Sequence, residues 1–146
     1  VVGLFAQRGY NIDTLTVAPT DDDTLSRLTL TTQGDDHMAE QIVKQLHKLI
    51  DTLKVVDLTE GPHIERELML VKIKAVDNDI RTELKNCVEI FRGHIIDVTP
   101  TTYTVQLAGD SEKLDAFIEA VRDIGVMEVV RSGVSGISRG DKFLRV

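Results

Sequence analysis

The sequence predicts an α+β protein built from two small modules of the same design. Polar and apolar residues roughly alternate from Asn11 to Ala18, which is typical of a β-strand. Apolar residues recur at helical spacing from Met38 to Leu53. Beyond Gly61 and Pro62, which mark a boundary, the same order of elements returns. This recurrence indicates the internal duplication of one module.

The first half is predicted to contain the end of a helix, a hairpin, a second helix and a short strand. The opening residues VVGLFAQR have helical spacing and stop at Gly9. After the strand from Asn11 to Ala18, the turn-rich stretch PTDDDT leads to a second alternation at Leu28, Leu30 and Thr32. Asp35 or Asp36 can cap the next helix, whose apolar face carries Met38, Ile42, Leu46, Leu49 and Leu53. A short strand from Lys54 to Leu58 closes this half.

The second half is predicted to have the order β-α-β-β-α-β. Its first strand, from Met69 to Ala75, is apolar on both sides near its start, as a central strand is. A helix follows and ends at Gly93, for which we expect left-handed backbone. A hairpin and a second helix, capped by Asp110 or Ser111 and ended by Gly125, precede the last strand. The predicted hairpin strands are Ile95–Thr99 and Tyr103–Ala108, and the predicted last strand is Met127–Val130. The apolar face of the second helix carries Leu114, Phe117, Ile118, Val121 and Ile124.

This order is the split βαβ pattern of a ferredoxin-like unit. The first half matches it if one strand precedes Val1, so we expect further residues upstream. In this topology the first strand lies centrally, and without it the sheet would leave two rows of backbone donors and acceptors unpaired. The predicted domains are residues 1–60, a truncated ferredoxin-like module, residues 66–131, a complete one, and residues 132–146, a flexible or partner-docked tail.

Composition and charge narrow the functional classes. A chain of 146 residues with 42% hydrophobic residues should be folded, and modules of this size gain stability from association. The formal charge of −7 disfavours binding to nucleic acid or anionic lipid. No apolar run approaches the roughly 18 residues of a membrane span, and Cys87, the single cysteine, cannot form an internal disulfide. We therefore expect a cytoplasmic protein.

The sequence offers no catalytic or metal-binding constellation. His37, His47, His63 and His94 lack ligand spacing, and Cys87 has no C-x-x-C partner. The tail RSGVSGISRGDK lacks the spacing of a phosphate-binding loop, and Ser135 lies in G-x-S-G, not in G-x-S-x-G. The acidic run from Asp21 to Asp23 is typical of a solvated turn. We therefore predict no catalytic residue and no metal site.

The junction RGYN, at residues 8–11, is the one candidate binding feature. Gly9 can end the helix in left-handed backbone, which places the amide of Asn11 at the start of the following strand. There it could meet a ligand group, or it could bond to its own turn, as asparagine often does. Spacing alone favours the turn.

Long runs of the sequence closely resemble the small regulatory subunit of acetolactate synthase, also called acetohydroxyacid synthase. They include GLFAQRGYNIDTLTVAPT, TLSRLTLTT, QIVKQLHKLIDTLKVVDL, ERELMLVKIKA, EIFRGHIIDVTP, YTVQLAG, KLDAF and RSGVSGISRGDK. The likeness covers nearly the whole chain and lacks only that family's opening strand and the loop after it. It implies an N-terminal ACT domain, which is ferredoxin-like, and a C-terminal domain of related topology.

The resemblance also implies a function. In that family the small subunit has no catalytic activity of its own. It stimulates a large catalytic subunit, which carries thiamine diphosphate, Mg²⁺ and FAD, and it confers feedback inhibition by valine or a related branched-chain amino acid. ACT domains pair side by side, so a homodimer is expected, with the effector at the seam. The effector-binding positions that match the family are Asn11, Ile12 and Val17.

Two rival interpretations remain at this stage. The chain could be a stand-alone amino-acid sensor of ACT type without a catalytic partner, or a small ferredoxin-like enzyme. Reconstitution with an acetolactate synthase large subunit separates the first rival from the regulatory subunit. Turnover of pyruvate by the isolated chain would favour the second.

Overall fold

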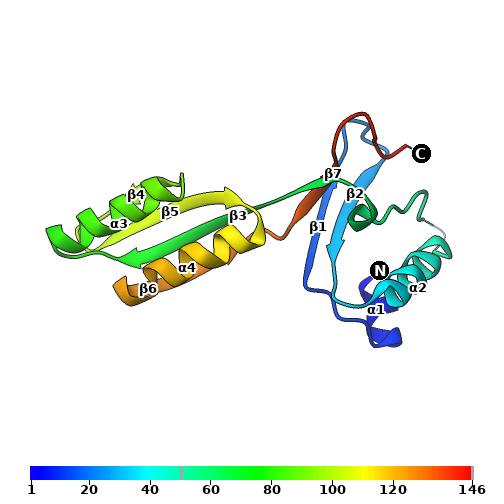
Figure 1. Cartoon of the computed structure of the whole chain (residues 1–146), viewed down its shortest axis with the longest axis horizontal. Coiled ribbons are helices and arrows are strands. Elements are labelled where there is room, and N and C mark those ends of the chain that lie inside the picture. Colours follow the sequence, from blue (N-terminus) through cyan, green and yellow to red (C-terminus); the bar gives the residue numbers. More distant parts are fainter. Residues whose placement is uncertain (50, 146) are drawn as a thin grey trace. The chain divides into compact units, whose positions relative to one another are not determined.

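The computed structural model describes residues 1–49 and 51–145, and it divides the chain into two compact units. Unit 1 comprises Val1–Glu65 and Ser135–Val146, and unit 2 comprises Arg66–Val134 (Figure 1). Both units combine helices with antiparallel strands, so the predicted α+β class is confirmed. Within the described ranges, no helix is long and apolar enough to cross a membrane.

Unit 2 has the predicted split βαβ topology. Its elements follow the order β3 (His63–Lys74), α3 (Asn78–Ile90), β4 (His94–Val98), β5 (Thr102–Gly109), α4 (Ser111–Gly125) and β6 (Val126–Arg131). The sheet order is β4-β5-β3-β6, so β3 lies centrally. It pairs antiparallel with β5 on one side and with β6 on the other, for example through Val71, which lies opposite Val105 and Val129. The predicted central position of this strand is therefore confirmed.

The core of unit 2 forms where the sheet meets the two helices. Met69, Val71 and Ile73 of β3 are fully buried. Because successive residues of a strand point to opposite faces, these three share one face. The helices α3 and α4 contact each other and supply Leu84, Val88, Leu114, Phe117 and Val121 to the same cluster. The rings of Phe91 and Phe117 meet edge to face, with centroids 5.4 Å apart.

Aspartates cap the longer helices. The side chain of Asp110 accepts the Lys113 N–H at 2.9 Å, and that of Asp35 accepts the Met38 N–H at 2.8 Å, so each of these caps is one of the two predicted alternatives. Asp77 caps α3 in the same way. These caps satisfy backbone donors that have no partner inside the helix.

The prediction of left-handed backbone at Gly93 is wrong. The residue with positive φ after α3 is Arg92, at 58°. Gly93 is needed for a different reason, because a Cβ built there would lie 3.0 Å from the carbonyl oxygen of Gln106 and 3.1 Å from Leu107 Cδ1. Close approach of β5 thus accounts for this glycine.

Unit 1 contains α1 (Val2–Arg8), β1 (Thr14–Pro19), β2 (Ser26–Thr31), α2 (Asp36–His47) and the 3₁₀ turn η1 (Leu58–Glu60). The strands β1 and β2 form the predicted hairpin, which pairs in register from Thr14 and Thr31 to Pro19 and Ser26. Phe5 of α1 and Ile42 of α2 are buried. The predicted left-handed glycine at the end of α1 is confirmed, since Gly9 has φ of 73°.

The predicted strand from Lys54 to Leu58 is wrong. The chain there is irregular and ends in η1, and α2 already ends at His47 instead of continuing to Leu53. A strand is stable only when its backbone groups pair with a neighbour. In the described part of unit 1, β1 and β2 pair with each other, and no strand lies beside residues 54–58. An apolar pattern alone therefore does not make this segment a strand.

The C-terminal segment is more ordered than the sequence predicts. Ser135–Ser138 form β7, which pairs with β3, and the Arg139 N–H donates to the Pro62 carbonyl at 3.0 Å. The Arg27 guanidinium donates to the Gly136 carbonyl at 2.8 Å. A Cβ on Gly136 would lie 2.7 Å from Leu58 Cδ1, so this position has no room for a side chain. Residues 135–138 are therefore part of unit 1.

Replacing Gly93 by alanine should lower the free energy of unfolding by about 1–3 kcal/mol, because the added methyl group meets a backbone carbonyl that cannot turn away. Gly61→Ala is the matched control, since nothing lies within 4 Å of the added Cβ there. Urea denaturation of both variants checks this. Equal stability of the two variants would show that β5 has more room than the structure indicates.

Candidate functional site

The junction between α1 and β1 is tied to the helix that precedes it. The Gly9 N–H donates to the Ala6 carbonyl at 3.4 Å, and the Tyr10 N–H donates to the Phe5 carbonyl at 2.9 Å. The Phe5 and Tyr10 rings meet edge to face, with centroids 5.5 Å apart. These bonds are those of a helix that ends at a left-handed glycine. The residue that follows, Asn11, is therefore presented from a fixed turn.

Asn11 is exposed, and its backbone is held in place. Its carbonyl accepts a hydrogen bond from the Thr32 hydroxyl. Close by, the Asp13 N–H donates to the Thr31 carbonyl at 2.8 Å, and the Thr14 and Thr31 hydroxyls lie 2.6 Å apart. Within the described residues the side-chain amide of Asn11 makes no bond to its own turn. It is thus available to an outside group as both donor and acceptor.

The other two predicted site residues differ in their surroundings. Ile12 is half-buried beside Asn11. Val17 lies on β1 opposite Leu28, and these two side chains are 59% and 39% exposed. At about 3.3 Å per residue, Val17 lies roughly 10 Å along β1 from Thr14, and Asn11 precedes Thr14. One protomer therefore brings Asn11 and Ile12 together and leaves Val17 apart from them.

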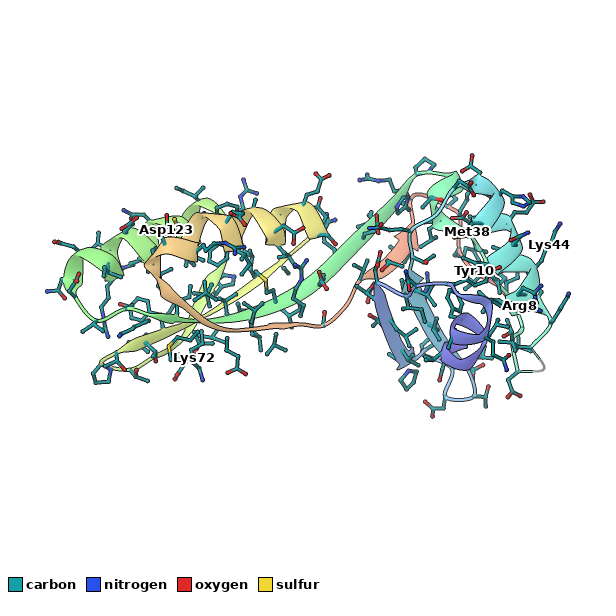
Figure 2. The ribbon with its side chains drawn as sticks, turned by 90° about the horizontal axis from the view of Figure 1, so that it is seen from below. Arg8, Tyr10, Met38, Lys44, Lys72 and Asp123 are labelled. Atoms are coloured by element: carbon teal, nitrogen blue, oxygen red, sulfur yellow. The ribbon has the colours of Figure 1, made fainter. Side chains whose placement is uncertain are left out.

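A shallow hollow of about 560 Å³ lies beside the junction, between the end of α1 and the exposed side of α2. Figure 2 shows Arg8, Tyr10 and Lys44 on this side of unit 1. The Arg8 guanidinium donates to the Gln45 side chain at 3.3 Å, and Lys44 pairs with Glu40 at 3.5 Å. The lining residues are Arg8, Tyr10, His37, Glu40, Gln41, Lys44, Gln45, His47 and Lys48.

This hollow was not predicted from the sequence, because its lining residues come from two segments far apart in the chain, residues 8–10 and 37–48. The sequence did place basic residues in the last turns of both helices, Arg8 in α1 and Lys44 and His47 in α2. Basic residues at these positions also complement the negative end of the helix dipole. The hollow favours anionic groups, but it holds no arrangement of nucleophile, base and orienting group.

Among residues 1–49 and 51–145, no group of three or more His, Cys, Asp or Glu side chains could hold a metal ion. His63 is a titratable group of unit 1 whose surroundings shift its pKa. The Gly61 carbonyl lies 3.0 Å from its Nδ1, and the Glu65 carboxylate lies 3.0 Å from its Nε2. Both contacts stabilise the protonated ring and raise the pKa of His63.

Two protein families match this chain. Residues 1–54 match the family described as "AHAS small subunit-like ACT domain", where AHAS is acetohydroxyacid synthase. Residues 66–140 match the family described as "Small subunit of acetolactate synthase". The chain therefore carries an ACT-type domain, followed by a domain typical of acetolactate synthase small subunits.

Individual proteins similar to this chain carry the same family name. The chain is 64% identical over 146 residues to the "Acetolactate synthase isozyme 3 small subunit" of Salmonella typhimurium, covering 99% of this chain and 89% of the relative. The corresponding Escherichia coli protein is 63% identical, with the same coverage. The crystal structure of the acetolactate synthase small subunit from Thermotoga maritima superposes with a TM-score of 0.86, at 38% identity, over 97% of this chain and 88% of that one. The chain belongs to the family of acetolactate synthase small subunits.

The contribution of His63 to stability should depend on pH. Its pKa is raised above the ordinary value of 6.5, so the stabilisation is fully present below pH 6.5 and is lost as the pH rises through the folded-state pKa. Urea unfolding of the native protein and of His63→Gln at pH 5.5 and pH 8.5 measures this. The difference in the free energy of unfolding between the two proteins should be larger at pH 5.5. A larger difference at pH 8.5 would contradict the contacts of His63 with Gly61 and Glu65.

Proposed function

We propose that this chain is the regulatory subunit of acetolactate synthase. It stimulates the large catalytic subunit and confers feedback inhibition by valine or a related branched-chain amino acid. The effector binds at the interface between the ACT-type units of two copies, at Asn11, Ile12 and Val17. The single observation that carries this proposal is the exposed Asn11 amide, two residues after the left-handed Gly9, which makes no bond to its own turn among the residues that the structure describes.

The chemistry of the junction suits a free amino acid. Such a ligand presents a carboxylate and an ammonium group, and the Asn11 amide can donate to the first and accept from the second. The isopropyl group of valine gains from burial, which contributes on the order of 1.5–3 kcal/mol for a side chain of this size. Ile12 and the exposed pair Val17 and Leu28 offer apolar surface for it.

The distance along β1 supports a site shared by two copies. Val17 lies three residues, or roughly 10 Å, further along β1 than Thr14, and Asn11 precedes Thr14, so a ligand of the size of valine held by the Asn11 amide lies away from Val17 of the same protomer. A second protomer placed side by side can supply one of the two contacts. Occupation then stabilises one dimer arrangement over another, and a ligand regulates only through such a difference in affinity between states.

The catalytic chemistry belongs to the partner in this proposal. Condensation of pyruvate with a second 2-oxo acid takes place on the large subunit, which would carry thiamine diphosphate, Mg²⁺ and FAD. The names of the relatives support such a partner, because each is called the small subunit of acetolactate synthase. A cytoplasmic location, expected from the single cysteine, is part of the same proposal.

Asn11→Ala should raise the valine concentration for half-inhibition by roughly ten-fold or more, because one hydrogen bond to a charged group contributes about 1.5–3 kcal/mol. Stimulation of the catalytic subunit should remain within about two-fold of the native value. Both are measured as acetolactate formation by the reconstituted enzyme at increasing valine concentration.

Asn86→Ala is the matched control, since Asn86 is an exposed asparagine of α3 in the other unit and should change neither quantity. Unchanged inhibition in Asn11→Ala would remove this residue from the site. Valine binding without any effect on a large subunit would favour a stand-alone sensor instead.

A further inference from the structure

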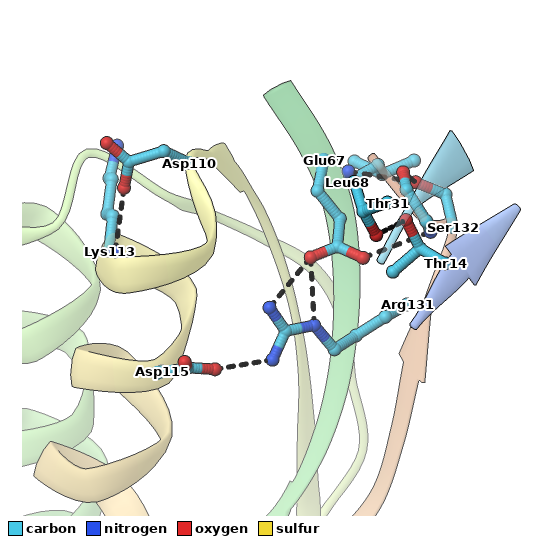
Figure 3. Close-up of polar contacts among 10 residues, drawn as sticks. Thr14, Thr31, Glu67, Leu68, Asp110, Lys113, Asp115, Arg131 and Ser132 are labelled. Atoms are coloured by element: carbon cyan, nitrogen blue, oxygen red, sulfur yellow. Dashed lines mark hydrogen bonds and ion pairs between the residues drawn. The ribbon is translucent and has the colours of Figure 1, made fainter. Parts of the chain in front are cut away.

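Glu67 is the charged residue that is buried among the described residues, and its side chain is only 3% exposed. Its Oε1 accepts from Arg131 twice, from Nη2 at 2.7 Å and from Nε at 3.0 Å. Its Oε2 accepts the Gly133 N–H at 3.0 Å. The remaining guanidinium nitrogen of Arg131 donates to Asp115 of α4 at 2.6 Å (Figure 3). Both oxygens of the buried carboxylate thus have partners near the end of unit 2.

The place of this cluster in the chain is unusual. The chain enters unit 2 at Arg66 and leaves it at Val134, so Glu67 is the second residue of the unit, and Arg131 and Gly133 are among its last four. The backbone strengthens the same link. The Leu68 N–H donates to the Ser132 hydroxyl at 3.0 Å, and the Ser132 N–H donates to the Leu68 carbonyl at 2.9 Å. Entry and exit are therefore bonded to each other.

Gly133 turns the chain out of β6 with a positive φ of 88°. Its N–H reaches the Glu67 carboxylate from this turn. A carboxylate that accepts a backbone N–H and two guanidinium N–H groups at once fixes direction as well as distance. The exit turn at Gly133 and the two-bond contact with Arg131 therefore both depend on the Glu67 side chain.

Stability alone does not explain a buried ion pair well. Removing two charges from water offsets much of their attraction, and a well-packed apolar pair is often as stable. An exposed pair of similar length exists on α4, where Arg122 and Glu119 lie 2.7 Å apart with side chains 63% and 69% exposed. Such surface pairs contribute little. What distinguishes Glu67 is that it joins the two ends of the unit and that its loss leaves Arg131 without its buried partner.

We propose that Glu67 is a positioning residue that locks the entry and exit of unit 2 into one rigid base, and that effector occupation reaches unit 2 through this base. The second part rests on the proposed regulatory function. Both covalent connections between the units leave unit 2 from this base. A displacement of either connection must therefore move both, or break the buried pair. Without the lock, only the backbone bonds between the two connections remain, these bonds open more readily, and the response to the effector is weakened.

The first experiment tests the lock without effector or catalytic partner. Amide hydrogen exchange is compared for the native protein, Glu67→Gln and the matched control Glu119→Gln. In Glu67→Gln, exchange at residues 66–68 and 131–134 should be at least ten-fold faster, with α3 and α4 protected to within about two-fold of the native protein. Unchanged exchange at these residues would overturn the lock. A uniform loss of protection across unit 2 would overturn it too, because it would show only a general stabilising role.

The second experiment tests the coupling in the enzyme reconstituted with the catalytic subunit. Glu67→Gln should raise the half-inhibiting valine concentration at least ten-fold and keep stimulation within two-fold of native. Arg131→Lys keeps the charge but cannot make the two guanidinium bonds to Glu67 together with the bond to Asp115, so it should have the same effect, and it serves if Glu67→Gln does not fold. A native inhibition curve in a folded variant would overturn the coupling role.

A double variant separates positioning from packing. Glu67→Met combined with Arg131→Met replaces the pair by apolar side chains and should recover the native urea midpoint while inhibition stays weakened. If the double variant recovers both the native urea midpoint and native inhibition by valine, the pair acts through stability alone, and the proposal is overturned. A native enzyme that shows no inhibition at all would instead contradict the proposed function, and the exchange experiment still decides the lock.

Discussion

The pairing of β3 on both of its edges is the constraint on which unit 2 depends. β5 and β6 both hydrogen-bond to this strand, and its buried face of Met69, Val71 and Ile73 is the surface on which α3 and α4 pack. Because β3 begins at His63 in unit 1 and continues into unit 2, the same strand also carries the chain between the units. Its pairing thus determines both the core of unit 2 and the place where Glu67 meets Arg131.

Local signals predicted most of this fold, and non-local pairing decided the rest. The caps at Asp35 and Asp110, the glycine at the end of α1 and the apolar first strand of the second module depend on neighbours in sequence. The prediction of a strand at residues 54–58 was wrong because an apolar pattern does not supply a partner strand. β7 was missed for the opposite reason, since its glycine-rich segment shows no alternation and is held by backbone pairing and by Arg27.

The candidate site was predictable only in part. Gly9 indicated a turn at the junction, but residue spacing favoured a local bond for Asn11, and only the structure shows its amide free of that bond among the described residues. The hollow beside it is lined by two segments far apart in the chain, which sequence spacing does not reveal. The burial of Glu67 could have been predicted from the sequence. It follows the same two-residue alternation as Met69, Val71 and Ile73, so its side chain lies on the buried face of the strand.

An effector that binds between two copies must strengthen their association, since binding and association are linked. The most direct measurement is therefore sedimentation equilibrium of the full-length protein with and without saturating L-valine. A site shared by two protomers predicts a dimer dissociation constant at least about ten-fold lower with valine, and no such shift in Asn11→Ala. A dissociation constant that is the same with and without bound valine would contradict a site between two copies.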